Sequence, residues 1–375
     1  MLSYPVTGKE VFDGLGRMKP FKAPSPDGMH ASFYQRNWNI VKEVVVREVC
    51  SIFSSGVMPN HLNQTLITLI PKCTGDDYLG LFRPISLCNT IYKIVTKLIV
   101  QRIRPLLDKL VSPLQIAFVL GRRGLDNMII VQKLIHTMST KKGNQGYMAI
   151  KIDLEKAYDR LEWHFIPPDT VKLIMSCISG SSISVLLNGG KLDPNLPSRG
   201  IRQGDPFSPY LFILCMEFLG HLIEEKCALP SCGLLLKLLV LAQLFLVFFF
   251  FADDLVLFAS ANSENCAAIS SALQEFCAKS GQKVSEAKSR VFFSPNVDPK
   301  ERETLTSILG FNSTNNLGKY LGFPIKQPGR QGHEFGSILD RVKKKLAGWK
   351  ANLLSMAGRM VLIQASSSAI PSYVM

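Results

Sequence analysis

The chain has 375 residues, 47% of them hydrophobic and 19% charged, which excludes an intrinsically disordered chain and leaves room for roughly two or three lobes. The formal net charge is +14. Such an excess of positive charge favours a polyanionic partner, chiefly nucleic acid, although a basic protein without such a partner would have the same composition.

The cysteines and the first residues exclude further classes. The nine cysteines form no C-x-x-C pair and no histidine cluster follows them, so we expect neither a zinc site nor a disulfide framework. Free thiols suit a reducing compartment, nuclear or cytoplasmic. Residues 1–19 lack the continuous apolar run of a signal peptide.

One Leu- and Phe-rich stretch, 234–252, has about the length of a transmembrane span. Lys237 and Gln243 interrupt it, and it runs directly into Asp253 and Asp254. We therefore expect a buried strand at its Phe-rich end and no membrane contact, with a membrane span as the alternative.

In chain order, the apolar spacing of the first half predicts three helices and one strand. The strand, 65–70, is ended by Pro71, and Arg83-Pro84 indicates a further break. The last two helices are 89–110 and 127–138, and basic residues accompany the apolar face of 89–110. The order is a Pro-rich turn at 20–28, a helix over 32–54, the strand, and these two helices.

The second half alternates strands and helices. A strand over 147–152 ends at Asp153, after which four apolar residues, Leu154, Tyr158, Leu161 and Phe165, mark one helical face. The remaining elements are a strand over 183–187 with a hairpin turn at 188–190, a helix over 209–225, two strands over 248–252 and 255–259 around an acidic tip, a helix over 267–280, a strand over 291–293, and a basic helical tail over 338–363.

The acidic tip is the first candidate site. Asp253 and Asp254 stand between two strongly apolar strands, where like charges raise each other's pKa and a divalent cation relieves the repulsion. The alternative is an ordinary exposed hairpin turn. If Asp153 lies beside the pair, three carboxylates can bridge two Mg²⁺ ions, as two-metal phosphoryl transfer requires. Spacing alone does not bring Asp153 to the pair.

Several motifs occur in one order along the chain. AIKIDLEKAYD ends a strand at Asp153, GIRQGDPFSPYLF begins at Gly200, and FADD begins at Phe251. KAPSPDG, LIPK and FRPISLCN precede them, and SGQKVSEAKS and KYLG follow. This ordered set resembles the reverse transcriptases of LINE-type (non-LTR) retrotransposons, with a plant-like pattern, over nearly the whole chain.

The resemblance implies an α+β fold, a right-hand polymerase with fingers, palm and partial thumb, in which a small antiparallel palm sheet is backed by helices. It divides the chain into an N-terminal extension at 1–60, fingers at 61–146, a palm at 147–330 and a partial thumb at 331–375. It also implies an RNA-directed DNA polymerase that uses two Mg²⁺ ions, with an RNA template, a DNA primer and deoxynucleoside triphosphates as partners. The oligomeric state stays open.

The resemblance also assigns residues. Asp153, Asp253 and Asp254 match the metal-binding triad, and Lys288 matches a lysine that protonates the leaving pyrophosphate; a surface charge is its alternative. Tyr158 matches the residue that rejects a ribose 2′-hydroxyl, or else packs in the core.

Further matches concern the substrates. Gln203 and Gly204 match a loop that lines the incoming base and template, or else form a plain turn. Lys72 and Arg83 match cations that hold the triphosphate, or else are solvated charges. The hairpin at 320–322 matches a primer grip. The basic tail is either the start of a thumb or a solvated helix face.

Two segments within the palm range depart from the family pattern. The chain is shorter than the pattern by about one helix in 166–180, where Pro167-Pro168 interrupts any helix, and 228–250 is uniformly Leu- and Phe-rich. No endonuclease domain precedes the motifs and no ribonuclease H follows them, so we expect a fragment of a polyprotein. The alternative function is therefore an inactive, truncated remnant that at most binds nucleic acid.

Overall fold

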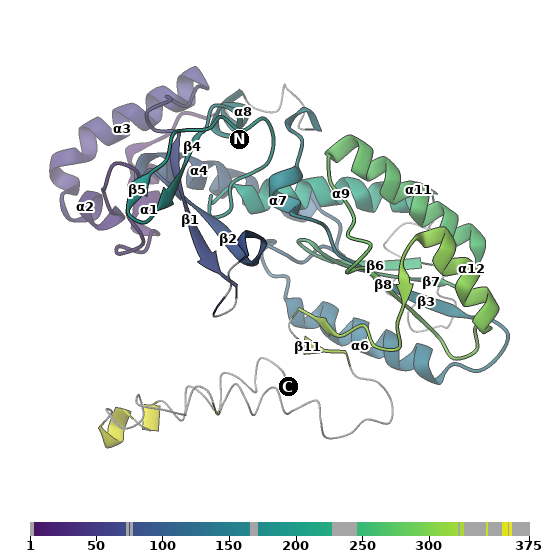
Figure 1. Cartoon of the computed structure of the whole chain (residues 1–375). Coiled ribbons are helices and arrows are strands. Elements are labelled where there is room, and N and C mark those ends of the chain that lie inside the picture. The colour runs from purple at the N-terminus through teal and green to yellow at the C-terminus, as the bar shows by residue number, and fades with distance from the viewer. Residues whose placement is uncertain are drawn as a thin grey trace.

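The computed structural model describes residues 4–325 apart from 73–74, 76–77, 166–171, 227–245 and 322, and in the tail 343, 355–358 and 360–361. Within this part the fold is a mixed α/β arrangement around two larger sheets, with a third sheet of two short strands (Figure 1). Most of the predicted tail helix, and the first part of the Leu-rich segment, lie outside the described residues. No helix in the described ranges is long and apolar enough to cross a membrane.

The larger sheet has five strands in the order β6-β7-β3-β8-β9. All neighbours are antiparallel except β8 and β9, which run parallel. The four predicted strands all form, with bounds β3 Tyr147–Ile152, β6 Leu246–Phe251, β7 Asp254–Ser260 and β8 Arg290–Phe293, and the short β9 Asn312–Ser313, which was not predicted, joins them. The Phe-rich end of the 234–252 stretch is therefore a strand, as expected.

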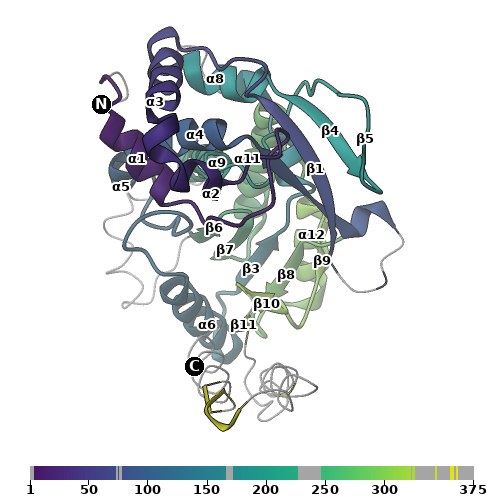
Figure 2. The ribbon, with the colours of Figure 1, turned by 90° about the vertical axis from the view of Figure 1, so that its left-hand side faces the viewer.

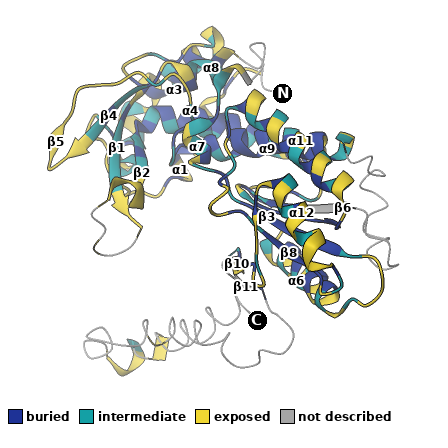
Figure 3. Cartoon of the chain, turned by 45° about the vertical axis from the view of Figure 1, so that its right-hand side comes forward, coloured by how far each residue is buried: buried dark blue, intermediate teal, exposed yellow. Residues whose placement is uncertain are grey.

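Both faces of this sheet are covered (Figure 3). Along β3, Met148 and Ile150 face a core shared with two long helices, whereas Tyr147 and Ala149 face a core shared with a third. Alternation of side chains along a strand produces this division. The helices are α9 Ser208–Lys226 and α11 Ser263–Ser280 on the first face and α6 Gly124–Thr140 on the second. The ends of β3 and β7 are thereby held rigidly between packed layers.

The smaller sheet has the order β2-β1-β4-β5, with bounds β1 Gln64–Pro71, β2 Phe82–Cys88, β4 Ser182–Leu187 and β5 Gly190–Lys191. The break expected at Arg83-Pro84 is wrong: both residues lie in β2, because an edge strand tolerates a proline that donates no hydrogen bond. The hairpin turn is confirmed at Asn188 and Gly189, whose φ angles are 50° and 81°.

Helices of the first 110 residues gather on one side of this smaller sheet, with α5 the farthest from it (Figure 2). Helices α1 and α12 were not predicted, although each starts at a recognisable cap: Thr7 forms a capping box with Glu10, and the Asp298 side chain accepts from Lys300 N. The set comprises α1 Gly8–Gly16, α2 Ala31–Arg36, α3 Trp38–Ser55, α4 Thr90–Ile103 and the short α5 Leu107–Leu110; α12 is Pro299–Leu309.

The long helix expected from Leu154 to Phe165 is wrong. Leu154 instead forms a β-bridge with Val284, and the Glu155 amide donates to Lys283 O at 2.8 Å. The backbone is thus committed to strand-like pairing where the helix was expected. Only the short helices α7 Ala157–Arg160 and η3 Trp163–Phe165 form, and α8 Lys172–Ser179 follows.

Two helix-ending glycines allow a matched stability test. Gly281 after α11 and Gly310 after α12 both have φ of 73°. A Cβ at Gly281 would lie 2.7 Å from Arg160 O, whereas a Cβ at Gly310 would meet nothing within 4 Å. We expect Gly310→Ala to lower the free energy of unfolding by about 1 kcal/mol, and Gly281→Ala to lower it by at least about 2 kcal/mol more, because the backbone must shift. Urea unfolding measures both, and equal losses would contradict the close approach.

Candidate active site

The register of the larger sheet brings the three predicted carboxylates, Asp153, Asp253 and Asp254, to the same end of neighbouring strands. This end of the sheet is here called the acidic edge. Ile152, the last residue of β3, pairs with Leu255 of β7, so the next residues, Asp153 and Asp254, lie opposite each other. Phe251 pairs with Asp254, which leaves Ala252 and Asp253 as a two-residue turn. Ala252 has a φ of 53°, a conformation that a non-glycine residue adopts only when its surroundings hold it there.

Repulsion between the carboxylates contributes to the raised pKa values of Asp253 and Asp254. Burial raises the pKa of Asp253, and the charge of Asp153 raises it further while Arg83 lowers it. Burial also raises the pKa of Asp254, followed by repulsion from Asp253, with Lys151 acting in the opposite direction. The edge therefore holds negative charge at a cost, and a cation would relieve that cost.

The third carboxylate already has a cationic neighbour. Lys288 Nζ lies 3.7 Å from Asp153 Oδ1, with 71% of the lysine side chain exposed. The backbone of Asp153 is fixed on both sides, because its amide donates to Ser289 Oγ at 3.2 Å and its carbonyl accepts from Ser285 N at 2.8 Å. Within the described ranges, no three His, Cys, Asp or Glu side chains are gathered tightly enough to hold a metal ion.

Tyr158 lies between the core and the acidic edge. Its ring stacks on Phe212 of α9, with centroids 5.1 Å apart and planes at 17°. Burial raises the pKa of its hydroxyl to about 12, and the charge of Asp253 contributes in the same direction. One face of the ring is thus packed in the core while the residue remains half-buried next to Asp253.

The loop of Gln203 and Gly204 is bound to the edge of the smaller sheet. The Gln203 carbonyl accepts from Ser86 N at 2.7 Å. Gly204 has a φ of +105°, and a Cβ there would lie 3.1 Å from Ser86 O, so the position requires glycine. A cavity of about 170 Å³ opens between this loop and β1, β2 and β4, lined in part by Ile67, Ser86 and Gln203.

The two remaining predicted cations differ in position. Arg83 is opposite Ile70 in the β1–β2 register and is exposed, yet its charge reaches Asp253. Lys72 is also exposed, but its Nζ donates to Gly80 O at 3.0 Å within its own hairpin. The structure therefore brings Arg83 toward the acidic edge and directs Lys72 elsewhere.

The hairpin that follows β9 also approaches the acidic edge. Its strands are β10 Lys319–Tyr320 and β11 Phe323–Pro324. Tyr320 is 1% exposed, and burial followed by the charge of Asp254 raises the pKa of its hydroxyl. Lys151 Nζ donates to Lys319 O at 2.5 Å. Gly322 of the predicted primer grip lies outside the described residues.

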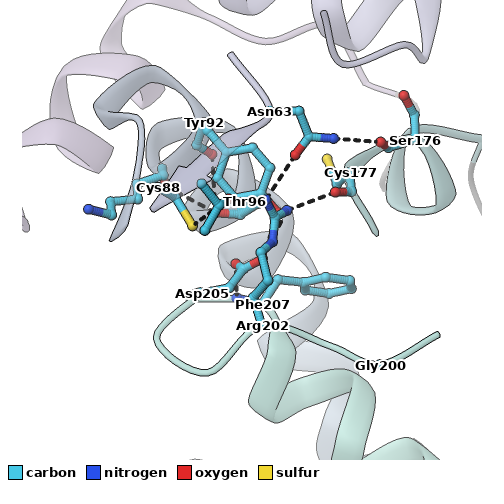
Figure 4. Close-up of polar contacts among 12 residues, drawn as sticks. Asn63, Cys88, Tyr92, Thr96, Ser176, Cys177, Gly200, Arg202, Asp205 and Phe207 are labelled. Atoms are coloured by element: carbon cyan, nitrogen blue, oxygen red, sulfur yellow. Dashed lines mark hydrogen bonds and ion pairs between the residues drawn. The ribbon is translucent and has the colours of Figure 1, made fainter. Parts of the chain in front are cut away.

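A buried network under the Gln203 loop escaped the sequence analysis (Figure 4). Arg202 Nη1 donates to Asn63 Oδ1 and Thr65 Oγ1, each at 2.9 Å, and Nη2 donates to Cys177 O at 2.7 Å and to the Tyr92 hydroxyl. The sequence pattern that could have predicted this network is the pair of opposite charges in GIRQGDP, Arg202 and Asp205, which lie three residues apart between apolar segments.

The counter-charge of this network is Asp205, on the other side of the loop. It lies 3.6 Å from Arg202 Nη2 and accepts from the Tyr92 hydroxyl at 2.6 Å and from Phe207 N at 3.0 Å. The Arg202 guanidinium also stands 4.3 Å from the Tyr92 ring centroid. Burial alone would lower the pKa of Arg202, but Tyr92 and its neighbours raise it, so the arginine stays charged. Loop residues 203 and 204 are thus clamped from both ends.

Residues 70–325 match the family model described as reverse transcriptase (RNA-dependent DNA polymerase). The chain belongs to this family. The family prediction is thereby confirmed. The matched range includes Asp153, Asp253 and Asp254.

Curated relatives of this reverse transcriptase chain come from mobile elements. It is 28% identical over 96% of its length to the transposon TX1 uncharacterised 149 kDa protein of Xenopus laevis, and covers 28% of that protein. It is 25% identical over 65% of its length to the Pol polyprotein of type-2 retrotransposable element R2DM of Drosophila melanogaster, covering 22%.

A third relative is the RNA-directed DNA polymerase from mobile element jockey of Drosophila funebris. It is 25% identical over 56% of the present chain, and the present chain covers 24% of that relative. The chain thus spans about a quarter of the length of these relatives. They support a LINE-type reverse transcriptase, whereas the plant-like character stays a prediction.

The clamp around the reverse transcriptase loop predicts a large stability effect. Arg202→Met would leave Asp205 buried without its cation, and we expect the free energy of unfolding to fall by about 3–5 kcal/mol. The matched control is Arg199→Met, because Arg199 pairs with Glu162 at 3.3 Å but is 50% exposed; we expect a loss of about 0–1 kcal/mol. Denaturant unfolding followed by tryptophan fluorescence compares them, and similar losses would show that the buried pair contributes no more than a surface pair.

Proposed function

We propose that the chain is an RNA-directed DNA polymerase of a LINE-type retrotransposon, adding deoxynucleotides to a DNA primer on an RNA template. The observation that carries the proposal is the register of β3, β6 and β7, which places Asp153, Asp253 and Asp254 at one sheet edge within a reverse transcriptase family match. The net charge of +14 suits a nucleic-acid substrate.

We assign the lobes on the same basis. The five-stranded sheet with α6, α9 and α11 suits a palm, and the β2-β1-β4-β5 sheet suits fingers. The proposed ranges remain 1–60, 61–146, 147–330 and 331–375. Strands β4 and β5 fall in the palm range, yet β4 pairs with β1 and β5 pairs with β4, so the chain returns to the fingers sheet before it completes the palm.

Asp153, Asp253 and Asp254 would hold two Mg²⁺ ions. Carboxylate oxygens are the hard ligands that Mg²⁺ prefers, and the burial and repulsion that raise the pKa of Asp253 and Asp254 support a cation there. Because the described side chains are not gathered tightly enough to hold an ion, we expect the three carboxylates to converge when Mg²⁺ binds. When bound, such ions activate a primer 3′-hydroxyl and stabilise the charge on the triphosphate and the leaving pyrophosphate.

The other predicted residues surround this edge with suitable chemistry. Arg83 is a cation for the triphosphate, because its charge already acts on Asp253. Lys72 would take the same role only after leaving its hydrogen bond to Gly80 O. Lys288, in contact with Asp153, is placed to supply a proton to the pyrophosphate. Gln203 and Gly204 would line the incoming base and template through the loop that the Arg202 network holds.

The alternative remains a remnant that binds nucleic acid without polymerising. Two segments that suggested decay form ordered elements where they are described: Lys172–Ser179 is helix α8, and Leu246–Phe251 is β6 in register with β7. These observations favour the polymerase. Nuclear or cytoplasmic location stays a prediction, as does the oligomeric state.

Primer extension tests the proposal. The purified chain, with an RNA template, a DNA primer, deoxynucleotides and Mg²⁺, should extend the primer, and Asp253→Asn/Asp254→Asn should lower the rate by at least about a thousandfold, because neutral amides cannot balance the cations. Asp13→Asn, an exposed carboxylate on α1, is the matched control and should extend normally. Absence of extension by folded wild-type protein that still binds the template–primer would favour the remnant.

Tyr158 is expected to select against ribonucleotides. Its ring is held against Phe212 beside Asp253, so Tyr158→Ala should open space next to the sugar and raise incorporation of ribonucleotides relative to deoxynucleotides by about tenfold. Tyr158→Phe keeps the stacked ring and should keep the selectivity. Single-nucleotide incorporation kinetics give the two ratios; an unchanged ratio in Tyr158→Ala would leave Tyr158 as a core residue only.

A further inference from the structure

A basic pocket that contains none of the three aspartates is lined by α4 and by the segment that joins α1 to α2. Its volume is about 310 Å³, at the lower end of the range for ligand pockets. No Asp or Glu is among its lining residues. The cations that line it, here called the basic pocket residues, are Arg17, Lys19, Lys22, Lys93 and Lys97.

The wall formed by residues 17–31 is fixed by hydrogen bonds. Gln35 Nε2 donates to the carbonyl oxygens of Leu15 and Met18, at 3.0 and 2.9 Å. Ser25 Oγ donates to Met29 O at 3.1 Å and lies 3.4 Å from Thr90 Oγ1 of α4. The pocket is therefore formed before any ligand arrives, which reduces the conformational entropy cost of binding.

The positive charge in the pocket is unfavourable for the protein alone. Lys93 and Lys97 are one helical turn apart and half-buried, a spacing at which like charges destabilise a helix. Burial and neighbouring cations, including Lys22, lower the pKa of both. Asp205 and Asp27 act in the opposite direction on the pKa of Lys93. No ion pair among the described residues involves any of the five basic pocket residues, so no carboxylate is in direct contact with these cations.

We propose that this pocket binds a phosphate group of a nucleic-acid strand or of a free polyphosphate, with the phosphate between Lys22, Lys93 and Lys97. Lysine ammonium groups bind phosphate as point charges, and several on a concave surface strengthen one another's attraction for an anion. The methionines 18 and 29 in the lining offer apolar contact to the attached sugar or base.

The position of the pocket favours a strand as the source. Gly204 and Pro206 also line it, so the loop that contacts β2 through Gln203 forms one of its walls. A strand held at the acidic edge could therefore continue into the pocket along one loop. The strand as source rests on the proposed polymerase function, whereas phosphate binding itself does not.

Binding of labelled single-stranded RNA by the 375-residue chain tests the proposal. Lys93→Gln/Lys97→Gln should weaken binding about tenfold at low salt and reduce the slope of log affinity against log salt by about 0.7 for each phosphate that the variant no longer neutralises. Lys42→Gln/Lys300→Gln removes the same charge from exposed positions elsewhere and should change affinity by less than about twofold.

One further variant and the conditions of the assay separate folding and catalysis from phosphate binding. Lys93→Arg/Lys97→Arg keeps the charge and should retain binding. The glutamine pair should melt at the same or a higher temperature than wild type without RNA, because the repulsion is relieved. RNA binding is measured without deoxynucleotides and requires no polymerisation, so failure of the polymerase proposal in primer extension leaves this outcome unchanged.

Competition by inorganic tripolyphosphate distinguishes the sources. A smaller RNA affinity and salt slope in the glutamine pair alone supports a strand phosphate. Unchanged RNA binding, with tripolyphosphate binding abolished only in the glutamine pair, supports a free polyphosphate. If RNA and tripolyphosphate bind to the glutamine pair as they do to the Lys42/Lys300 control, the proposal is wrong.

Discussion

The antiparallel register of β3 against β7 is the constraint on which the acidic edge depends. Asp153 follows the last paired residue of one strand, and Asp254 is the first residue of the other, so a slip of one residue would turn one carboxylate to the opposite face. Burial on both faces of the sheet specifies the register, because β3 and β7 each present apolar residues to two separate cores. The packing of the sheet therefore sets the geometry of its charges.

The Arg202 network fixes the position of loop residues 203 and 204, just as the strand register fixes the position of the carboxylates. A buried guanidinium is costly unless its donors are satisfied, and here they reach the start of β1, helix α4, the end of α8 and Asp205. The ion pair thereby joins segments from Asn63 to Asp205, far apart in the chain. Removing Arg202 alone would destabilise the fold because Asp205 would stay buried without a cation, but the intact pair contributes little net stability. Its main effect is to fix the backbone at residues 203 and 204.

Much of the fold was predictable because its local signals agree with its tertiary packing. The four longer strands of the larger sheet, the helix over 209–225 and the turn at Asn188-Gly189 follow directly from periodicity and turn chemistry. The prediction failed after Asp153, where a helical apolar pattern is overridden by pairing of Leu154 with Val284, contacts that no local window contains. The Arg202 clamp was missed for the same reason, since its partners are distant in sequence.

The edge of the smaller sheet shows how one contact can serve two needs. Backbone amides alternate in direction along a strand, so the positions of Pro84 and Ser86 face the same way, toward the open side of β2. Pro84 has no N–H, and the N–H of Ser86 is taken by Gln203. The loop that would meet substrate therefore also closes a strand edge that could otherwise recruit another chain. Displacing that loop would expose a free amide on β2, so weaker substrate binding and a tendency to self-associate through strands would arise together.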